Sequence, residues 1–257
     1  MRRLLSAVAM LILLTSACGE DTLAAGTYDG PLAAEGRQGA AHRVVECDDA
    51  PTGGNNYPGE YDNGALSDEP EAALRTAFDE AQITGVHDGY VLVREDDDRA
   101  LFTFTDAGRV RQALIVHDGE AFGKEGWYVE SWARCDYAEL PAAVAERAGV
   151  EIWFDADGPV STRRVHSADG PEHCGWQHLT FLSLGETTYV RDADTEYAEW
   201  TDAPYDSEAD LPPHAVDTGF HRDGDHLWRS PDGTRAYVGN REKVAVWPRT
   251  KDGFTCA

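Results

Sequence analysis

The sequence carries little positive charge. Lysine occurs only at positions 124, 243 and 251, and 22 basic residues stand against 47 acidic ones, which gives a formal net charge of −25. A chain this anionic repels phosphate groups, so nucleic-acid binding and attachment to anionic lipid by charge are excluded. Apolar runs are also short, and none reaches the roughly 20 residues that a membrane-spanning helix requires.

Motifs of common enzyme classes are missing as well. The sequence contains no Gly-x-Ser-x-Gly, no Ser-x-x-Lys, no His-Glu-x-x-His and no phosphate-binding loop. These absences disfavour a serine hydrolase or metallohydrolase of a common kind. We therefore predict no catalytic residue and no cofactor.

Residues 1–17 have the three parts of an export signal. Two arginines precede an apolar run that ends at Leu14, and the small residues Thr15, Ser16 and Ala17 lead to Cys18. A Cys after small residues resembles the lipobox of bacterial lipoproteins, although Thr15 stands where that family usually has Leu. The resemblance implies a cleaved signal peptide, a lipid on Cys18 and a location on the extracellular face of the cell membrane. Plain secretion is the alternative.

The rest of the chain divides into three predicted parts. Residues 18–40 are rich in Gly, Ala and acids, with little to bury, and are predicted to form a flexible tether. Residues 41–149 are expected to form an α+β half, and residues 150–257 a β-rich half. The boundary falls at Gly149, which ends a short helical segment.

Apolar alternation and turn sequences predict a β-rich α+β fold of antiparallel meanders. A capping-box pattern at Asp68 starts a helix over 68–81, and a second, short helix is expected through 141–148. Turn sequences separate the strands of the first half, which are predicted at 42–47, 89–94, 100–105, 109–117 and 127–134. The second half is predicted to contain a hairpin of 150–154 with 160–165 and further strands at 178–184, 187–191, 225–229, 234–239 and 244–248.

Cysteine usage fits one lipid and two disulfides. With Cys18 assigned to lipid, Cys47, Cys135, Cys174 and Cys256 form an even set in an oxidising compartment. Four cysteines allow three pairings. The two halves have similar turn sequences and similar Cys spacing, which suggests an internal duplication and favours Cys47–Cys135 and Cys174–Cys256. Unrelated meanders with shared turn chemistry, and buried free thiols, are the alternatives.

Three segments resemble a known group of proteins. They are Glu130–Cys135, Gly170–Trp176 and Thr180–Leu182. They resemble uncharacterised secreted lipoproteins of high-GC actinobacteria, over most of the mature chain. That group has no assigned activity, so the resemblance implies export and two Cys pairs and supplies no catalytic residue.

Histidine and aspartate provide weak candidates for a metal site. His173, Cys174 and His178 have the chemistry of zinc ligands, but Cys174 is better used in a disulfide. His221 and His226 flank an acidic turn and are expected to be exposed. No metal site is therefore predicted.

The sequence Asp155-Ala156-Asp157-Gly158 begins like a calcium loop. The fifth and twelfth positions of that loop would be Pro159 and His166, and neither side chain supplies the required oxygen. A hairpin turn with Gly158 at positive φ is predicted instead.

Trp127 and Trp132 are the candidate ligand-binding residues. They lie five apart on one predicted strand, so they are expected to face opposite sides. One would be in the core and the other would be a stacking platform for a sugar or a protein. Core packing of both is the alternative.

The leading hypothesis is a non-enzymatic surface lipoprotein, a binding or envelope-associated module that holds a partner by an aromatic or acidic face. It would contact the membrane through its lipid anchor, with a protein or glycan as partner. The alternatives are an extracellular hydrolase with paired carboxylates and a weak divalent-cation binder that uses acidic loops such as Glu95–Asp98.

Overall fold

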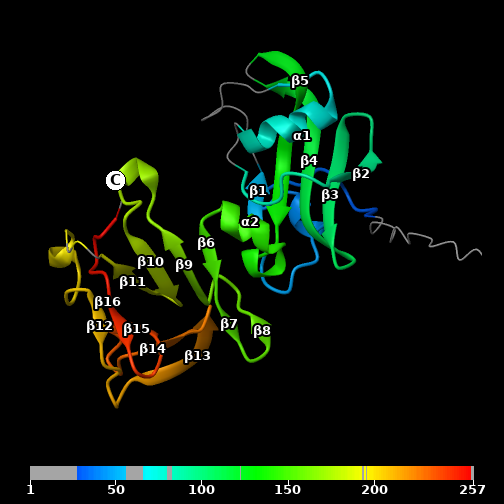
Figure 1. The fold of residues 1–257 in the computed structure, drawn as a ribbon. Helices are drawn as coiled ribbons and strands as arrows, with labels where there is room; N and C mark the ends of the chain where they lie inside the picture. The colour runs from blue at the N-terminus through cyan, green and yellow to red at the C-terminus, as the bar shows by residue number, and fades with distance from the viewer. Residues whose placement is uncertain are drawn as a thin grey trace, which may run out of the picture.

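Three antiparallel sheets make up most of the computed structural model, which describes residues 28–55, 66–79, 83–121, 123–192, 194 and 196–255 (Figure 1). Two α-helices accompany the sheets in these ranges. The predicted β-rich α+β class is therefore confirmed. The predicted signal peptide 1–17 and Cys18 lie outside the described residues. Among the described helices, none is long and apolar enough to cross a membrane.

The first sheet arises from the predicted meander. Its strands lie side by side in the order β1-β5-β4-β3-β2, and every pair is antiparallel. The strands β2 to β5 fall on the four segments predicted from 89 to 134, whereas β1 was not predicted. The bounds are β1 (Thr52–Asn55), β2 (Val91–Glu95), β3 (Arg99–Asp106), β4 (Arg109–Ala121) and β5 (Lys124–Arg134).

The helix α1 (Pro70–Asp79) covers one face of this sheet. It lies within the helix predicted over 68–81. Its residues Ala73 and Leu74 are buried against Phe102, Leu114 and Val116 of the strands β3 and β4. Phe78, one turn after Leu74, packs against the same cluster, so an apolar stripe of the helix closes this side of the core.

The segment 28–45 covers the opposite face of the same sheet. Leu32, Ala40 and Val44 are buried there against strand residues such as Leu101 and Ile115. The prediction of a tether through 40 is therefore wrong from residue 28 onward, while residues 18–27 lie outside the described ranges. The central strands are apolar on both faces, so the face that α1 leaves open needs this cover.

A strand predicted at 42–47 is also absent, because this part of the covering segment forms the 3-10 turn Ala41–Arg43. Ala41 is fully buried, and its N–H donates to the Ser131 hydroxyl of the strand β5. The segment thus contacts the sheet through this side chain and through single backbone hydrogen bonds, such as that from the Glu46 N–H to the Val110 carbonyl at 2.7 Å, and it adds no strand.

The helix α2 (Ala142–Arg147) leads into two further sheets. One has the order β11-β10-β9-β6, and the other has the order β12-β16-β15-β14-β13-β7-β8. The first comprises β6 (Val150–Ile152), β9 (Val165–Asp169), β10 (Thr180–Leu184) and β11 (Thr187–Arg191). The second comprises β7 (Phe154–Asp155), β8 (Gly158–Pro159), β12 (Asp206–Ala209), β13 (Val216–Arg222), β14 (Asp225–Arg229), β15 (Arg235–Gly239) and β16 (Val244–Pro248).

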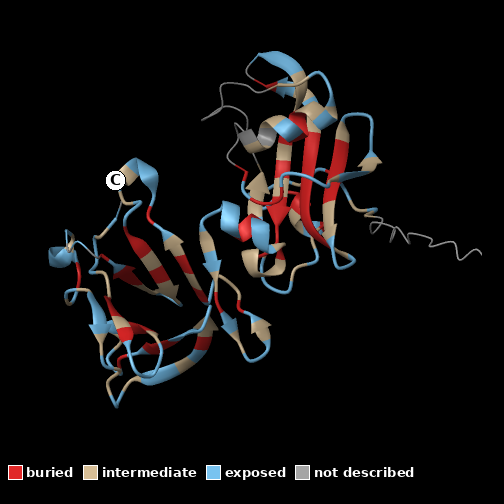
Figure 2. Cartoon of the chain, in the orientation of Figure 1, coloured by how far each residue is buried: buried red, intermediate tan, exposed pale blue. Residues whose placement is uncertain are grey.

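These two sheets share one apolar core. Leu182 and Tyr189 of the smaller sheet pack with Leu227 and Trp247 of the larger one, and Trp153 joins both. Figure 2 shows buried residues along the strands of each sheet. Most of these strands were predicted from alternating apolar residues, and in the structure apolar residues of both sheets face this shared core.

The hairpin predicted from 150–154 and 160–165 is confirmed next to its turn, where the Val160 N–H donates to the Trp153 carbonyl at 2.8 Å, but the pairing of its outer part is wrong. Strand β6 pairs with β9, with Val150 opposite Ala168, whereas β7 and β8 form a tight turn attached to the larger sheet. The reason is Trp153, which lies between β6 and β7. Its side chain is buried and its Nε1–H donates to Ser167, so the chain passes from one sheet to the other at this residue.

The meanders β2–β5 and β13–β16 have the same connectivity. Their surroundings differ, because α1 covers the first and a second sheet faces the other. The internal duplication stays a prediction.

Candidate functional site

The two tryptophans singled out from the sequence, Trp127 and Trp132, lie on the same face of the first sheet. Both are partly buried against the core beneath α1. The expectation of opposite faces is wrong because β5 contains a bulge. Ile115 pairs with Ser131 and Val116 pairs with Val129, so residue 130 is extra and reverses the alternation. Neither ring therefore forms a separate platform on the far face.

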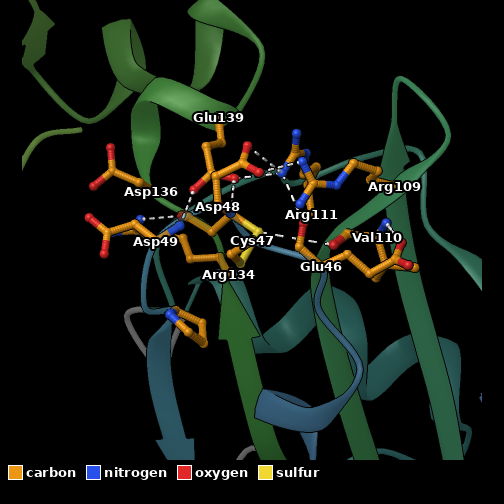
Figure 3. The surroundings of a disulfide bond; sticks show 12 residues. Glu46, Cys47, Asp48, Asp49, Arg109, Val110, Arg111, Arg134, Asp136 and Glu139 are labelled. Atoms are coloured by element: carbon orange, nitrogen blue, oxygen red, sulfur yellow. Dashed lines mark hydrogen bonds and ion pairs between the residues drawn. A yellow bond between two sulfur atoms is a disulfide. The ribbon is translucent and has the colours of Figure 1, made fainter. Parts of the chain in front are cut away.

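The predicted disulfide between Cys47 and Cys135 is present (Figure 3). Its Cα atoms are 5.1 Å apart, and it joins the segment before β1 to the residue that follows β5. Cys174 is also disulfide-bonded. Its predicted partner, Cys256, lies outside the described residues.

A cluster of carboxylates and guanidinium groups surrounds this disulfide (Figure 3). The Glu139 carboxylate accepts hydrogen bonds from the Asp48 N–H at 2.8 Å and from Arg111 Nη1 at 2.5 Å. Arg109 pairs with the Asp48 carboxylate at 2.6 Å. Opposite charges around Cys47 therefore fix the loop that precedes β1 to the turn that follows β5.

Residues of the second half of the chain also contact this cluster. The hydroxyl of Ser161 donates to Asp49 at 2.7 Å, and Arg163 donates to the Ala50 carbonyl at 2.8 Å. A cavity of about 450 Å³ lies there, lined by Asp48, Asp49, Arg111, Ala138, Glu139, Pro159 and Ser161. We call this region the junction.

Two carboxylates of the junction, Asp48 and Asp49, have a lowered pKa. The hydrogen bond from Arg109 holds the pKa of Asp48 below its usual value, and the hydrogen bond from Ser161 does the same for Asp49. A general acid in glycoside hydrolysis needs a carboxyl whose pKa is raised. Of the two partners, Ser161 comes from the second half and joins it to Asp49, whereas Arg109 lies in the first half at the start of β4.

Aromatic rings gather elsewhere on the second half, and we call them the aromatic surface. The rings of Trp176 and Phe254 are stacked, with centroids 4.6 Å apart. Phe181 lies 5.7 Å from Trp176, and Tyr197 and Trp200 lie 5.6 and 6.5 Å from Phe254. Trp200 is 42% exposed and the other rings are partly exposed.

Three distant segments of the chain bring these rings together. Trp176 follows the 3-10 turn Glu172–Cys174, which ends at Gly175 with a φ of 71°. Trp200 ends the 3-10 turn Ala198–Trp200, and its carbonyl accepts the N–H of Lys251 at 2.8 Å. These turns show no periodic pattern of apolar residues, and the aromatic surface was therefore not predicted.

A polar cavity of about 620 Å³ adjoins the aromatic surface. Within it, Arg249 donates from Nε and Nη2 to the Asp202 carboxylate at 2.8 and 2.7 Å. The cavity and the aromatic surface share the chain from Trp200 to Asp202 and from Arg249 to Phe254. The residues that line the polar cavity are all polar or charged: Glu186, Thr187, Thr188, Asp202, Arg249, Thr250, Lys251 and Asp252.

The histidines considered as metal ligands are not gathered into a site. His178 lies near Tyr197, with its Nε2 3.5 Å from the Glu196 carboxylate. His221 and His226 are paired across β13 and β14 with ring centroids 6.0 Å apart. In the part of the chain that the structure describes, no three His, Cys, Asp or Glu side chains are placed to hold a metal ion.

The sequence at 155–158 forms the predicted hairpin turn. Asp155 pairs with Gly158, and the Asp155 carboxylate accepts the N–H of Asp157 at 2.9 Å. Gly158 has a φ of 132°, a conformation that favours glycine. The Asp155 side chain thus stabilises the turn.

Comparison with protein-family models, with curated proteins and with solved structures finds no match to this chain. The junction has its charges paired internally, whereas the aromatic surface and the polar cavity present unlike chemistries side by side to solvent.

Proposed function

We propose that this chain is an exported lipoprotein that acts as a non-enzymatic binding module, and that its aromatic surface holds the ligand. The observation that carries the proposal is the stack of Trp176 on Phe254 beside the exposed ring of Trp200. Large aromatic rings contribute strongly to binding when a ligand removes them from water. An exposed group of such rings is typical of an interaction site.

The surroundings of the rings support binding instead of core formation. The core of the second half is already made by Trp153, Tyr189 and Trp247, which are buried between the two sheets. The rings of the aromatic surface lie outside this core and contact mainly one another. Trp200 is the exposed member of this group, so its ring is the one most open to a partner, and the other rings support it.

The export part of the proposal rests on the N-terminal sequence and is supported by the disulfides. The bond between Cys47 and Cys135, together with the bonded state of Cys174, fits an oxidising compartment outside the cytosol. A lipid on Cys18 would then hold the module at the outer face of the membrane. Acyl chains anchor by hydrophobic burial, so the anionic surface does not oppose them.

A retention experiment tests the binding function. It uses the full lipidated chain in detergent and measures how much envelope material the chain retains. The chain is immobilised, exposed to envelope extract and washed, and the retained saccharide and protein are quantified. We expect Trp200→Ala to lower the retained amount at least fivefold.

Phe154→Ala is the matched control, because Phe154 is 41% exposed and lies on β7, away from the aromatic surface. This variant should retain as much as the unsubstituted chain. Equal retention by all three chains would show that the aromatic surface is not the binding site.

A further inference from the structure

We infer that the ligand of the aromatic surface is an uncharged oligosaccharide, whose rings stack on Trp200 and Phe254 while its hydroxyl groups pair with the polar cavity. This inference rests on the proposed binding function and adds the chemical class of the ligand. The inference requires that one ligand contacts both the aromatic surface and the polar cavity.

The backbone joins the two features rigidly. The Lys251 N–H donates to the Trp200 carbonyl at 2.8 Å, and Thr201 pairs with Thr250 in an isolated β-bridge. The Phe254 N–H donates to the Lys251 carbonyl at 3.2 Å. The wall of the cavity and the exposed rings are therefore held in a fixed relation, and an extended ligand can contact both.

The cavity is suited to a ligand with many hydroxyl groups. Its lining consists of carboxylates, threonines and two cations, and its volume of about 620 Å³ lies within the range of about 300 to 1,000 Å³ found for small-molecule sites. The Asp202 N–H donates to the Arg249 carbonyl at 3.0 Å, in addition to the pairing of their side chains. These two residues thus offer acceptors and donors in a fixed geometry, which lowers the entropic cost of binding.

The aromatic rings would bind the apolar side of a sugar. An aromatic face carries partial negative charge, and the C–H groups on one side of a pyranose ring carry partial positive charge, so the two attract. Trp176 and Phe254 are tilted by only 22° from each other, and Trp200 and Phe254 by 25°. Trp176 therefore covers one face of Phe254, and Trp200, which is 42% exposed, presents the most open ring on which a sugar unit can stack.

Charge favours an uncharged ligand over an anionic one. The cavity has three carboxylates, Glu186, Asp202 and Asp252, against the cations Arg249 and Lys251. The whole chain has a net charge of −25. An acidic polysaccharide would be repelled by both.

An apolar or proline-rich peptide is the competing ligand, because aromatic grooves also bind such peptides. A peptide of this kind would stack on Trp200 and Phe254 but would leave the polar groups of the cavity without new partners. Covering polar groups without pairing them is unfavourable. The cavity residues therefore distinguish the two ligand classes.

Titration of the full lipidated chain in detergent micelles, followed by tryptophan fluorescence and calorimetry, tests the inference. The probes are cellohexaose, maltohexaose and chitohexaose, with an oligogalacturonate and a decaproline peptide as comparisons. We expect saturable binding of at least one uncharged hexasaccharide. Trp200→Ala should weaken that binding at least tenfold, and Asp252→Asn at least threefold.

Two matched controls should leave the affinity unchanged. Asp97→Asn removes an exposed carboxylate far from the cavity, on the turn between β2 and β3, and Phe154→Ala removes an equally exposed ring. Binding of no uncharged hexasaccharide overturns the inference, and so does decaproline binding that Asp252→Asn leaves intact. In either case the binding function itself still depends on the separate retention experiment with Trp200→Ala.

Discussion

Thr162 donates both its backbone N–H and its hydroxyl to the carboxylate of Asp136, at 2.9 and 2.6 Å. Asp136 is only 5% exposed and also accepts the N–H of Ala138 at 2.9 Å, which caps the 3-10 turn Tyr137–Glu139. One carboxylate therefore stabilises the end of the first half and holds the first loop of the second half. The junction is thus a structural joint built on hydrogen bonds to charge, which are stronger than neutral ones.

Asp136→Ala is expected to lower the free energy of unfolding by about 3 kcal/mol. The substitution leaves the Thr162 and Ala138 donors without their acceptor and removes the cap. Urea unfolding followed by circular dichroism measures the change. Asp217→Ala is the control, because Asp217 is exposed and accepts only the Gly219 N–H among the described contacts. Equal losses in the two variants would contradict a joint at Asp136.

The junction is expected to weaken in acid. The pKa of Asp49 is lowered, first by its hydrogen bond from Ser161, from a usual value of 3.8. A carboxyl with a lowered pKa in the folded state contributes stability that is fully present above its unfolded pKa. That contribution is lost as the pH falls through the folded pKa. The free energy of unfolding should therefore drop below about pH 4.

Other carboxylates titrate in the same range, so a difference between variants makes the measurement specific. Unfolding by urea at pH 6, 4 and 3 should show a smaller acid loss for Asp49→Asn than for the unsubstituted chain. Asp97→Asn should keep the full loss. An Asp49→Asn curve parallel to that of the unsubstituted chain would show that Asp49 plays no part in the acid response.

The disulfide between Cys47 and Cys135 is expected to add about 4 kcal/mol of stability, since it closes a long loop in the unfolded chain, with a sequence separation of 88. Replacing both cysteines by alanine tests this in urea unfolding. A reductant alone would not, because Cys174 is also disulfide-bonded. A loss below about 1 kcal/mol in the double variant would contradict the expectation.

Acylation at Cys18 is the expected state of the exported chain. Cys18→Ala should abolish labelling by a palmitate analogue and move the chain from the detergent phase to the aqueous phase in phase partition. Thr15→Leu, which restores the residue usual in the lipobox, should keep both properties. Labelling that persists in Cys18→Ala, or an unlabelled natural chain of the mass expected after plain secretion, would refute lipidation.

Local pattern was enough to predict the strands β2 to β5 of the first sheet and its helix, but not β1. Turn residues separate the strands β2 to β5, and apolar residues one turn apart mark α1. The segment around Leu32 was misjudged, because its small and acidic residues look like a tether. It packs against the sheet only because the buried face around Leu101 and Ile115 needs cover, and that requirement appears only once the sheet has formed.

The candidate site was harder to predict for the same reason. Trp176, Trp200 and Phe254 come from turns without periodicity, and only the closed fold of the second half brings them together. The sequence-based candidates, Trp127 and Trp132, pack against the core beneath α1 and are not part of the aromatic surface. Strand alternation also misplaced Trp132, because a bulge depends on the partner strand and leaves no mark in a single sequence.

Deleting Glu130 tests whether the bulge sets the face on which Trp127 lies. Without the extra residue, side chains would alternate strictly along β5. The residues on one side of the deletion would then move to the opposite face of the sheet, and Val129, which is now 3% exposed, could be among them. Glu130→Ala keeps the bulge and loses the ion pair with Arg99 and the contact with His117. We expect the deletion to cost at least about 2 kcal/mol more than the substitution in urea unfolding. It should also shift tryptophan emission to longer wavelength, as Trp127 or Trp132 leaves the core beneath α1. Equal cost and unchanged emission in the two variants would mean that packing against α1, and not the bulge, holds both rings on one face.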